Sequence, residues 1–257
     1  ELNLYFKEFR SKNAKIGFVP TMGALHKGHL SLIEESSKEN DITVASIFVN
    51  PTQFDKKEDL DNYPKTLEND LNLLNKIACD VLFIPSVEEI YNNTILARQF
   101  DFDGLENEME GKYREGHFNG VGTIVKKLFE IVLPTRAYFG EKDFQQLQII
   151  RKLVKKTALD VNIVCCATFR EANGLAMSSR NARLTLQEKE AAAIIFQTLS
   201  GVKDKLEKLP LDAVHNLVLE QFENQPLFES DYFTIADEET LKSAPTISPE
   251  KTYRTSL

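Results

Sequence analysis

Two histidines stand near the start of the chain, in the run from Pro20 to His29 (PTMGALHKGH). A spacing of three places His26 and His29 on one face of a first helical turn. A helix N-terminus offers unpaired N–H groups to phosphate, and Gly28 lets a ligand approach the backbone. The alternative is two surface histidines in a loop. Half of the chain's four histidines fall in this run, so we favour a phosphate-binding turn.

Three further segments carry polar groups at expected strand ends or in a loop. Asn50 and Gln53 can each donate and accept hydrogen bonds, which suits a substrate with hydroxyl and carboxylate groups. Lys142 supplies a charge for phosphate, and Gln146 lies one helical turn later. The run from Met177 to Asn181 (MSSRN) is typical of a mobile phosphate clamp. Taken singly, each also fits a capped turn or an ordinary surface loop.

Apolar runs alternate with amphipathic stretches through the first two thirds of the chain. Short β-branched or apolar runs predict strands at 16–19, closed by Pro20, and at 42–49, 81–84, 137–139 and 161–167. Spaced apolar residues predict helices at 25–38, 60–77, 120–132 and 144–156. This rhythm predicts an α/β fold with a parallel sheet and right-handed crossovers. The polar segments then fall where ligands bind open α/β sheets.

The pattern changes after residue 183. Helices are expected at 184–206 and 210–222, followed by a strand at 232–236. We therefore predict two domains: residues 1–168, a Rossmann-like domain with a parallel sheet, and residues 169–257, a smaller α+β C-terminal domain.

Composition excludes several classes of protein. The 257 residues are 42% hydrophobic and 27% charged, and the net charge of −8 argues against a nucleic-acid binder. Cys79, Cys165 and Cys166 form no disulfide or zinc pattern, which predicts a reducing, cytoplasmic location. No apolar run reaches the length of a membrane span, and the run from Glu1 to Arg10 shows no signal peptide.

The motifs together resemble a known family. The His-X-Gly-His run resembles the nucleotidyltransferase superfamily, whose members attack the α-phosphate of a nucleoside triphosphate. Six blocks, in order, are similar to the pantothenate synthetase (pantoate–β-alanine ligase) family: 17–29, 48–54, 59–64, 116–121, 138–146 and 173–181. The tail, 249–257, departs from the family's last strand, which indicates either that the chain is truncated or that residues are missing from it.

The resemblance implies a role for each matching residue. His26, His29, Lys142 and Arg180 would be catalytic, with His29 a proton donor to the phosphate chain. Gln53 would contact pantoate and β-alanine, Gln146 would hold pantoate, and Asn50 would also bind substrate. ATP would be bound by Met22, Gly23, Ala24, Leu25, His26, Lys27, Gly28, His29, Gly140, Glu141, Lys142, Asp143, Phe169, Met177, Ser178, Ser179 and Arg180.

The activity implied is condensation of pantoate with β-alanine by ATP, through a pantoyl-adenylate, with Mg²⁺ and in a homodimer. The Rossmann-like domain would bind nucleotide and pantoate, and the C-terminal domain would act as a lid. A nucleotidyltransferase that keeps AMP or CMP on its product is the nearest alternative.

Two more distant alternatives were weighed on the same residues. A tRNA synthetase is disfavoured because the chain is short and acidic and lacks a Lys-Met-Ser-Lys-Ser loop. A nucleotide-binding module without catalysis is the alternative from another class. The expected partners are the small molecules ATP, pantoate and β-alanine and a second copy of the chain, whereas nucleic acid and membrane are not expected.

Overall fold

The computed structural model describes residues 2–92, 94–223 and 225–257. Contacts divide them into two compact units. The first comprises Glu1–Phe102, Arg114–Phe169 and Met177–Ser179, and the second comprises Asp103–Tyr113, Arg170–Ala176 and Arg180–Leu257.

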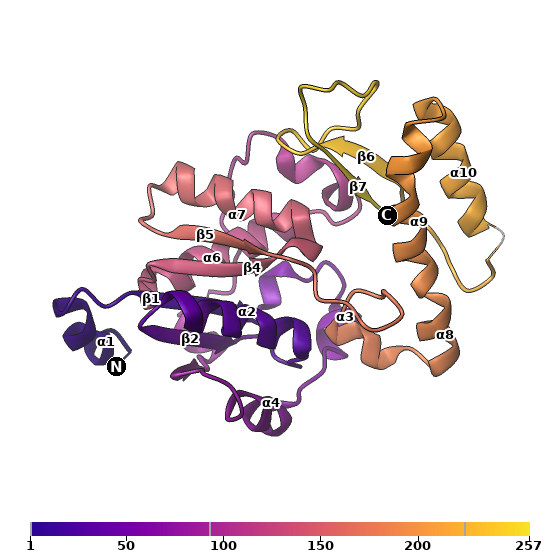
Figure 1. Cartoon of the computed structure of the whole chain (residues 1–257). Coiled ribbons are helices and arrows are strands. Elements are labelled where there is room, and N and C mark those ends of the chain that lie inside the picture. Colours follow the sequence, from indigo (N-terminus) through magenta and orange to yellow (C-terminus); the bar gives the residue numbers. More distant parts are fainter. Residues whose placement is uncertain (1, 93, 224) are drawn as a thin grey trace. The chain divides into compact units, whose positions relative to one another are not determined.

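The first unit is built on a five-stranded parallel sheet in the order β3-β2-β1-β4-β5 (Figure 1). Its strands are β1 (Ile16–Thr21), β2 (Ile42–Ile47), β3 (Val81–Phe83), β4 (Arg136–Gly140) and β5 (Asn162–Cys166). The predicted α/β class with a parallel sheet is confirmed. Strand β1 lies at the centre, with β2 next to it on one side and β4 on the other. The strand order therefore reverses between β1 and β4, and open α/β sheets bind ligands at such a point.

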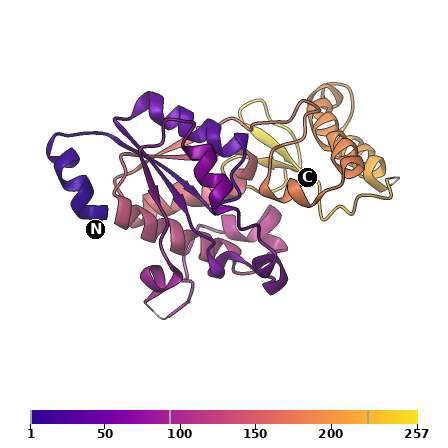
Figure 2. The same ribbon diagram turned by 90° about the horizontal axis from the view of Figure 1, so that it is seen from below.

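Helices cover both faces of this sheet, as the view from below shows (Figure 2). On one face Ile33 of α2 packs in a cluster with Val19 and Tyr138. On the other face Phe129 of α6 meets the rings of Phe18 and Phe139 edge-on. Successive strand residues point to opposite faces, so both faces are buried. The longer helices are α1 (Leu2–Ser11), α2 (Lys27–Glu39), α4 (Leu67–Leu74), α6 (His117–Val132) and α7 (Phe144–Thr157), and the short ones are α3 (Lys57–Asp61), α5 (Val87–Tyr91), η1 (Pro51–Gln53) and η4 (Glu141–Asp143).

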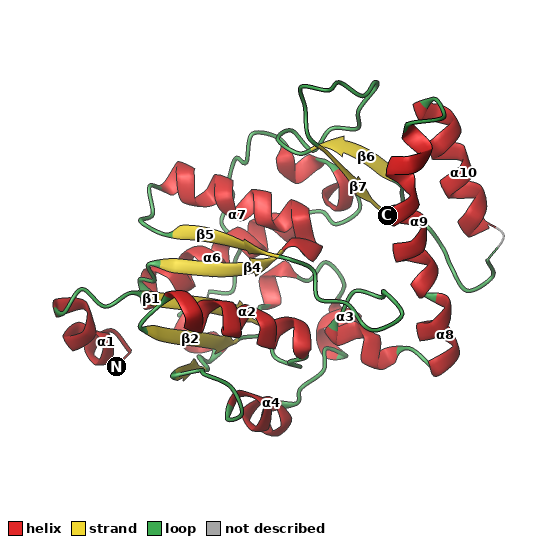
Figure 3. Cartoon of the chain, viewed as in Figure 1, coloured by secondary structure: helices red, strands yellow, loops and turns green. Residues whose placement is uncertain are grey.

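The second unit combines helices with a two-stranded antiparallel sheet (Figure 3). Its elements are η2 (Leu105–Asn107), η3 (Met109–Lys112), η5 (Ser179–Arg183, which begins in the first unit), α8 (Leu186–Ala191), α9 (Ala193–Leu206), α10 (Leu211–Glu223), β6 (Thr234–Asp237) and β7 (Tyr253–Ser256). Its core joins Val202 of α9, Val214 and Phe222 of α10 and Ile235 of β6. This unit therefore has a core of its own and is α+β, as expected.

Several elements differ from the sequence-based expectation. Strand β1 continues through Pro20 to Thr21, with Pro20 level with Ser46 of β2. The helix expected at 60–77 is two helices, because Pro64 lacks an N–H and disfavours helical backbone at Tyr63. The helix expected at 184–206 is interrupted only at Ala192, whose backbone (φ −63°, ψ −14°) stays near helical.

The ends of the chain also hold elements that the sequence did not suggest. Residues Leu2–Ser11 form α1, in which Phe6 is fully buried and Arg10 Nη2 donates to Val132 O at 2.6 Å. The tail, in which no family-like strand was expected, forms β7 and pairs with β6, with Thr255 opposite Ile235. The absence of a family-like motif therefore did not prevent strand pairing. Among the helices described, none combines the length and apolar character needed to cross a bilayer.

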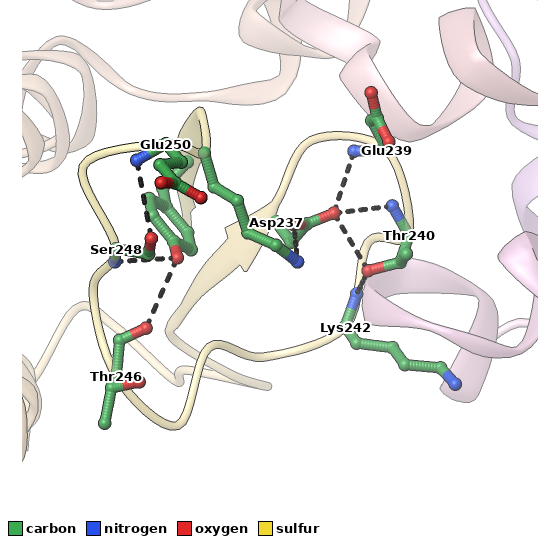
Figure 4. Close-up of polar contacts among 9 residues, drawn as sticks. Asp237, Glu239, Thr240, Lys242, Thr246, Ser248 and Glu250 are labelled. Atoms are coloured by element: carbon green, nitrogen blue, oxygen red, sulfur yellow. Dashed lines mark hydrogen bonds and ion pairs between the residues drawn. The ribbon is translucent and has the colours of Figure 1, made fainter.

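Asp237 is the polar centre of the loop region that joins the two strands of the second unit (Figure 4). Its Oδ1 accepts from the backbone N–H groups of Glu239 and Thr240 and from the Thr240 hydroxyl, at 2.9 to 3.1 Å. Its Oδ2 pairs with Lys251 Nζ at 2.8 Å. The hydrogen bond from Lys251, with those from Thr240, lowers the pKa of the Asp237 carboxyl to about 2. The carboxylate thus joins the start of the loop to its end.

We predict that Asp237→Asn loosens the 237–253 loop. The amide retains an acceptor for the backbone N–H groups but loses the ion pair with Lys251. Because the folded-state pKa lies below the usual 3.8, wild-type stabilisation is complete above that value and is lost as the pH falls through about 2. Hydrogen exchange should show faster exchange in the variant at pH 7. Equal exchange in both proteins at pH 7 would contradict the assignment.

Candidate active site

Three neighbouring strands of the first unit end at one edge of the sheet. The turn 22–26 follows β1, the segment 50–53 follows β2, and 141–146 follows β4. Strand β1 lies between β2 and β4, and all three are parallel. The carboxyl ends of parallel strands share an edge, so the sheet brings three of the four predicted segments together.

A buried carboxylate holds the turn after β1. Asp70 of α4 is 1% exposed, and it accepts from the N–H groups of Ala24 at 2.9 Å and Leu25 at 2.8 Å. The Thr66 hydroxyl donates to the same carboxylate at 3.1 Å. Ala24 has φ of 49°, which is costly for a residue with a Cβ. The charge-assisted bonds to Asp70 offset that cost and fix the turn.

The two histidines open helix α2 as a stacked pair. Their ring centroids are 4.0 Å apart with an interplanar angle of 30°. His26 Nδ1 accepts from Gly28 N–H at 3.1 Å, so a neutral His26 carries its hydrogen on Nε2. A Cβ on Gly28 would lie 2.9 Å from this ring. Glycine at position 28 therefore makes room for the His26 imidazole, a reason that the sequence did not reveal.

Burial is the main cause that lowers the pKa of His29 to about 3, and the neighbouring His26 lowers it further. Its Nδ1 is buried and has no hydrogen-bond partner among the described residues. A ring with this pKa is neutral at pH 7. As the turn stands, His29 can donate a hydrogen bond from one nitrogen but holds no excess proton.

Asn50 and Gln53 are adjacent at the end of β2. Asn50 Nδ2 donates to Gln53 Oε1 at 3.1 Å, and Gln53 Nε2 contacts Met22 Sδ at 3.0 Å. Asn50 is 1% exposed, whereas Gln53 is partly exposed. The amide of Gln53 thus lies against the turn after β1.

The segment after β4 carries the charged groups. Lys142 Nζ pairs with Asp143 Oδ1 at 3.0 Å, and both side chains are exposed. Glu141, Lys142 and Asp143 form η4, and Gln146 lies in the first turn of α7. The positive charge of Lys142 is therefore partly balanced by its neighbour in this structure.

The fourth predicted segment is divided by the two units. Ser179 Oγ donates to Ala24 O at 3.0 Å, and Met177 N–H donates to Phe169 O at 3.0 Å. These contacts bring Met177–Ser179 to the turn after β1. Phe169 has a 40% exposed side chain, and its carbonyl accepts from Met177. Arg180 is exposed and belongs to the second unit, so its predicted part in the site stays a prediction.

Sequence reasoning missed the residues that hold the site in shape. Asp70 lies in the stretch 60–77, for which the sequence predicted only a helix, and the two backbone N–H groups that it accepts from lie more than forty positions away. His117 Nδ1 lies 2.6 Å from Gln53 O. His117 and Gly120 stood inside a family-like block, but the spacing gave them no role.

Within 2–92, 94–223 and 225–257, no group of three His, Cys, Asp or Glu side chains is placed to hold a metal ion. Asp143 is a carboxylate at the same sheet edge as His29 and Lys142. A cation that arrives with a polyphosphate needs one or two such carboxylates besides phosphate and water oxygens, so Asp143 fits that requirement.

Comparison with known proteins decides the family. The family model for pantoate-beta-alanine ligase matches residues 1–256. The chain belongs to the pantoate–β-alanine ligase family. It is 55% identical to the pantothenate synthetase of Flavobacterium psychrophilum, over 99% of this chain and 90% of that protein. It is 50% identical to that of Christiangramia forsetii, over 96% of this chain and 88% of that protein.

Solved structures of the pantoate–β-alanine ligase family have the same fold. A pantothenate synthetase from Thermus thermophilus matches with a TM-score of 0.84 and 39% identity, covering 92% of this chain and 86% of that one. A pantoate-beta-alanine ligase from Francisella tularensis, complexed with beta-gamma ATP and beta-alanine, matches with a TM-score of 0.73 and 39% identity, covering 86% of this chain and 84% of that one.

We predict that Asp70→Asn releases the turn after β1. One of the two acceptor oxygens becomes an NH₂ group that faces a backbone donor, which costs about 1–3 kcal/mol of unfolding free energy. The amides of Ala24 and Leu25 should exchange with deuterium faster than in the wild type. The exposed Glu68→Gln on the same helix is the matched control. Unchanged protection of both amides in Asp70→Asn would refute the anchoring role.

Proposed function

We propose that this chain condenses pantoate with β-alanine by means of ATP, through an enzyme-bound pantoyl-adenylate, at the sheet edge formed by β2, β1 and β4. One observation carries the assignment of the site. The stacked pair His26 and His29 shares this edge with the amide of Gln53 and with Lys142, so phosphate-binding and substrate-binding groups converge within one unit.

The first step follows from the weakness of a carboxylate as an acyl electrophile. The carboxylate of pantoate attacks the α-phosphorus of ATP, the bond to the bridging oxygen breaks, and pyrophosphate leaves. Negative charge grows on the leaving oxygens, where His29, Lys142 and Arg180 stabilise it. Burial lowers the pKa of His29 to about 3 and favours the neutral imidazole, so we propose that it contributes a preorganised N–H to the leaving oxygens.

The second step uses the activated acyl group. The amine of β-alanine attacks the carbonyl carbon of the adenylate, and AMP leaves with the former carboxylate oxygen. Gln53 contacts both substrates and Gln146 holds pantoate. ATP lies against 22–29, 140–143, Phe169 and 177–180. We propose that residues 169–257 act as the lid domain that keeps water from the adenylate, with residues 1–168 as the binding domain.

Mg²⁺ is proposed to accompany ATP and to neutralise charge on its phosphates. Asp143 would supply a protein carboxylate, because its carboxylate is exposed and paired with Lys142 at 3.0 Å. Release of Lys142 from this pair frees its ammonium for phosphate. A homodimer and a cytoplasmic location stay predictions from the sequence and the family resemblance, as does the absence of nucleic-acid partners.

We predict that His29→Ala lowers the rate of adenylate formation by about 10²–10³-fold, with a much smaller effect on the Kd for ATP. The lost N–H is aimed at charge that develops during the reaction. Single-turnover measurement of the first step and calorimetry of ATP binding separate the two effects. Gln146→Ala is the contrasting variant, because it should raise the Kd for pantoate and leave ATP binding nearly intact. A near-normal rate of adenylate formation in His29→Ala would contradict the proposed role of His29 in stabilising the leaving oxygens.

Exchange of labelled pyrophosphate into ATP tests the proposed function directly. If a pantoyl-adenylate forms, the first step is reversible on the enzyme. Label should then enter ATP in the presence of pantoate and Mg²⁺ and in the absence of β-alanine. Exchange should vanish when pantoate is omitted, because no carboxylate is then present to accept AMP.

The alternatives give different results in the same assay. A nucleotidyltransferase with another acceptor would show no dependence on pantoate, and a binding module would show no exchange. Exchange that requires β-alanine would contradict the two-step path even if pantothenate were formed.

A further inference from the structure

Asn50 uses its whole hydrogen-bonding capacity inside the protein. Its Nδ2 donates to Gly120 O at 3.2 Å and to Gln53 Oε1 at 3.1 Å. Its Oδ1 accepts from the hydroxyls of Tyr91 at 2.5 Å and Thr52 at 3.1 Å. A side-chain amide has two N–H groups and two lone pairs, so none is left for a ligand. With 1% exposure, Asn50 is placed to orient its neighbours and not to touch a substrate.

The chain of contacts has a fixed direction. The carbonyl of Gly120 can only accept, so the nitrogen of Asn50 must face it. The second N–H of Asn50 then points to Gln53, which must turn its oxygen toward Asn50. The Nε2 of Gln53 is left beside Met22 Sδ at 3.0 Å, and a thioether is only a weak acceptor. An oxygen of the substrate is a stronger partner for this N–H.

Helix α6 fixes the main chain of Gln53 as well as the direction of its amide. His117 Nδ1 lies 2.6 Å from Gln53 O, and a carbonyl accepts, so this nitrogen carries the hydrogen. A Cβ on Gly120 would lie 2.1 Å from Thr52 O and 2.6 Å from the Cα of Gln53. The helix can therefore approach η1 only with glycine at position 120.

We propose that Asn50 is a positioning residue that presents Gln53 to its substrates as a hydrogen-bond donor, selecting a carboxylate or hydroxyl oxygen as the partner. This inference rests on the proposed function, in which Gln53 contacts pantoate and β-alanine. The family resemblance implied that Asn50 itself binds substrate. In this inference Asn50 instead determines which end of the Gln53 amide, the NH₂ group or the oxygen, faces the substrate.

Replacement of Gln53 tests the polarity. Gln53→Glu retains oxygens that accept from Asn50 but has no N–H to offer, and its charge opposes a substrate carboxylate. Its kcat/KM for pantoate should fall at least as far as that of Gln53→Ala, about 10- to 100-fold for a lost hydrogen bond. The KM for ATP should change little in both. A Gln53→Glu enzyme close to the wild type would show that Gln53 accepts, and would overturn the proposal.

A double-mutant cycle tests whether Asn50 acts through Gln53. Asn50→Asp retains acceptors for Tyr91 and Thr52 but removes both N–H donors. It should lower kcat/KM for pantoate in the wild-type background and add nothing in the Gln53→Ala background. A direct contact with substrate, or a general loss of structure, would lower activity in both backgrounds and contradict the proposal. Tyr91→Phe keeps both donors of Asn50 and is the matched control, expected to stay near the wild type.

Two comparisons separate this inference from the proposed function. Failure of the wild-type chain to form pantothenate from pantoate, β-alanine and ATP would refute the proposed function itself. If the wild type is active, the variants of Asn50 and Gln53 test only the orientation of the Gln53 amide. Thermal unfolding of each variant identifies loss of fold. Should Asn50→Asp fail to fold, the comparison of Gln53→Glu with Gln53→Ala still decides, because Gln53 is partly exposed.

Discussion

The candidate site depends on the parallel pairing of β1 with β2 on one side and β4 on the other. Parallel strands end at the same edge, so three segments distant in sequence start from neighbouring points. β1 is well suited to the central place because both of its faces are buried, with Phe18 on one and Val19 on the other. A shift in the register of β1 would move the histidine turn relative to both neighbours at once.

Beyond the sheet, buried polar groups set the geometry of the loops. Asp70 accepts from two backbone N–H groups of the turn that follows β1. Asn50, in the segment that follows β2, uses all of its hydrogen-bond donors and acceptors. Such groups must be fully paired to be tolerated in the interior, and full pairing leaves one orientation. The turn that leads to His29 and the partly exposed amide of Gln53 are thereby held in one orientation. Precision at the site therefore comes from residues buried beneath the loops.

Local patterns made much of the fold and part of the site predictable. The run 42–49 is apolar or β-branched at every position except Ser46, and β2 occupies most of it. The spacing of His26 and His29 predicted a shared face, and the rings do stack. The role of Asp70 could not be predicted because the two backbone N–H groups that it accepts from lie 45 and 46 positions away, and the spacing of nearby residues carries no information on such contacts. Glycine inside a helix is unfavourable by itself, so the sequence gives no reason for Gly120. The reason is the close approach of the η1 backbone, and only the tertiary structure shows that contact.

The electrostatics of the site explain how an acidic protein can bind a polyphosphate. With a net charge of −8, long-range attraction of anions is weak, so affinity must come from local donors. The described groups at the sheet edge are largely neutral: His29 holds no excess proton, and Lys142 is paired with Asp143. A helix N-terminus and an oriented N–H add attraction without burying an unpaired positive charge. The pair between Lys142 and Asp143 is exposed and therefore weak, so the phosphates of a bound ligand can compete for the Lys142 ammonium.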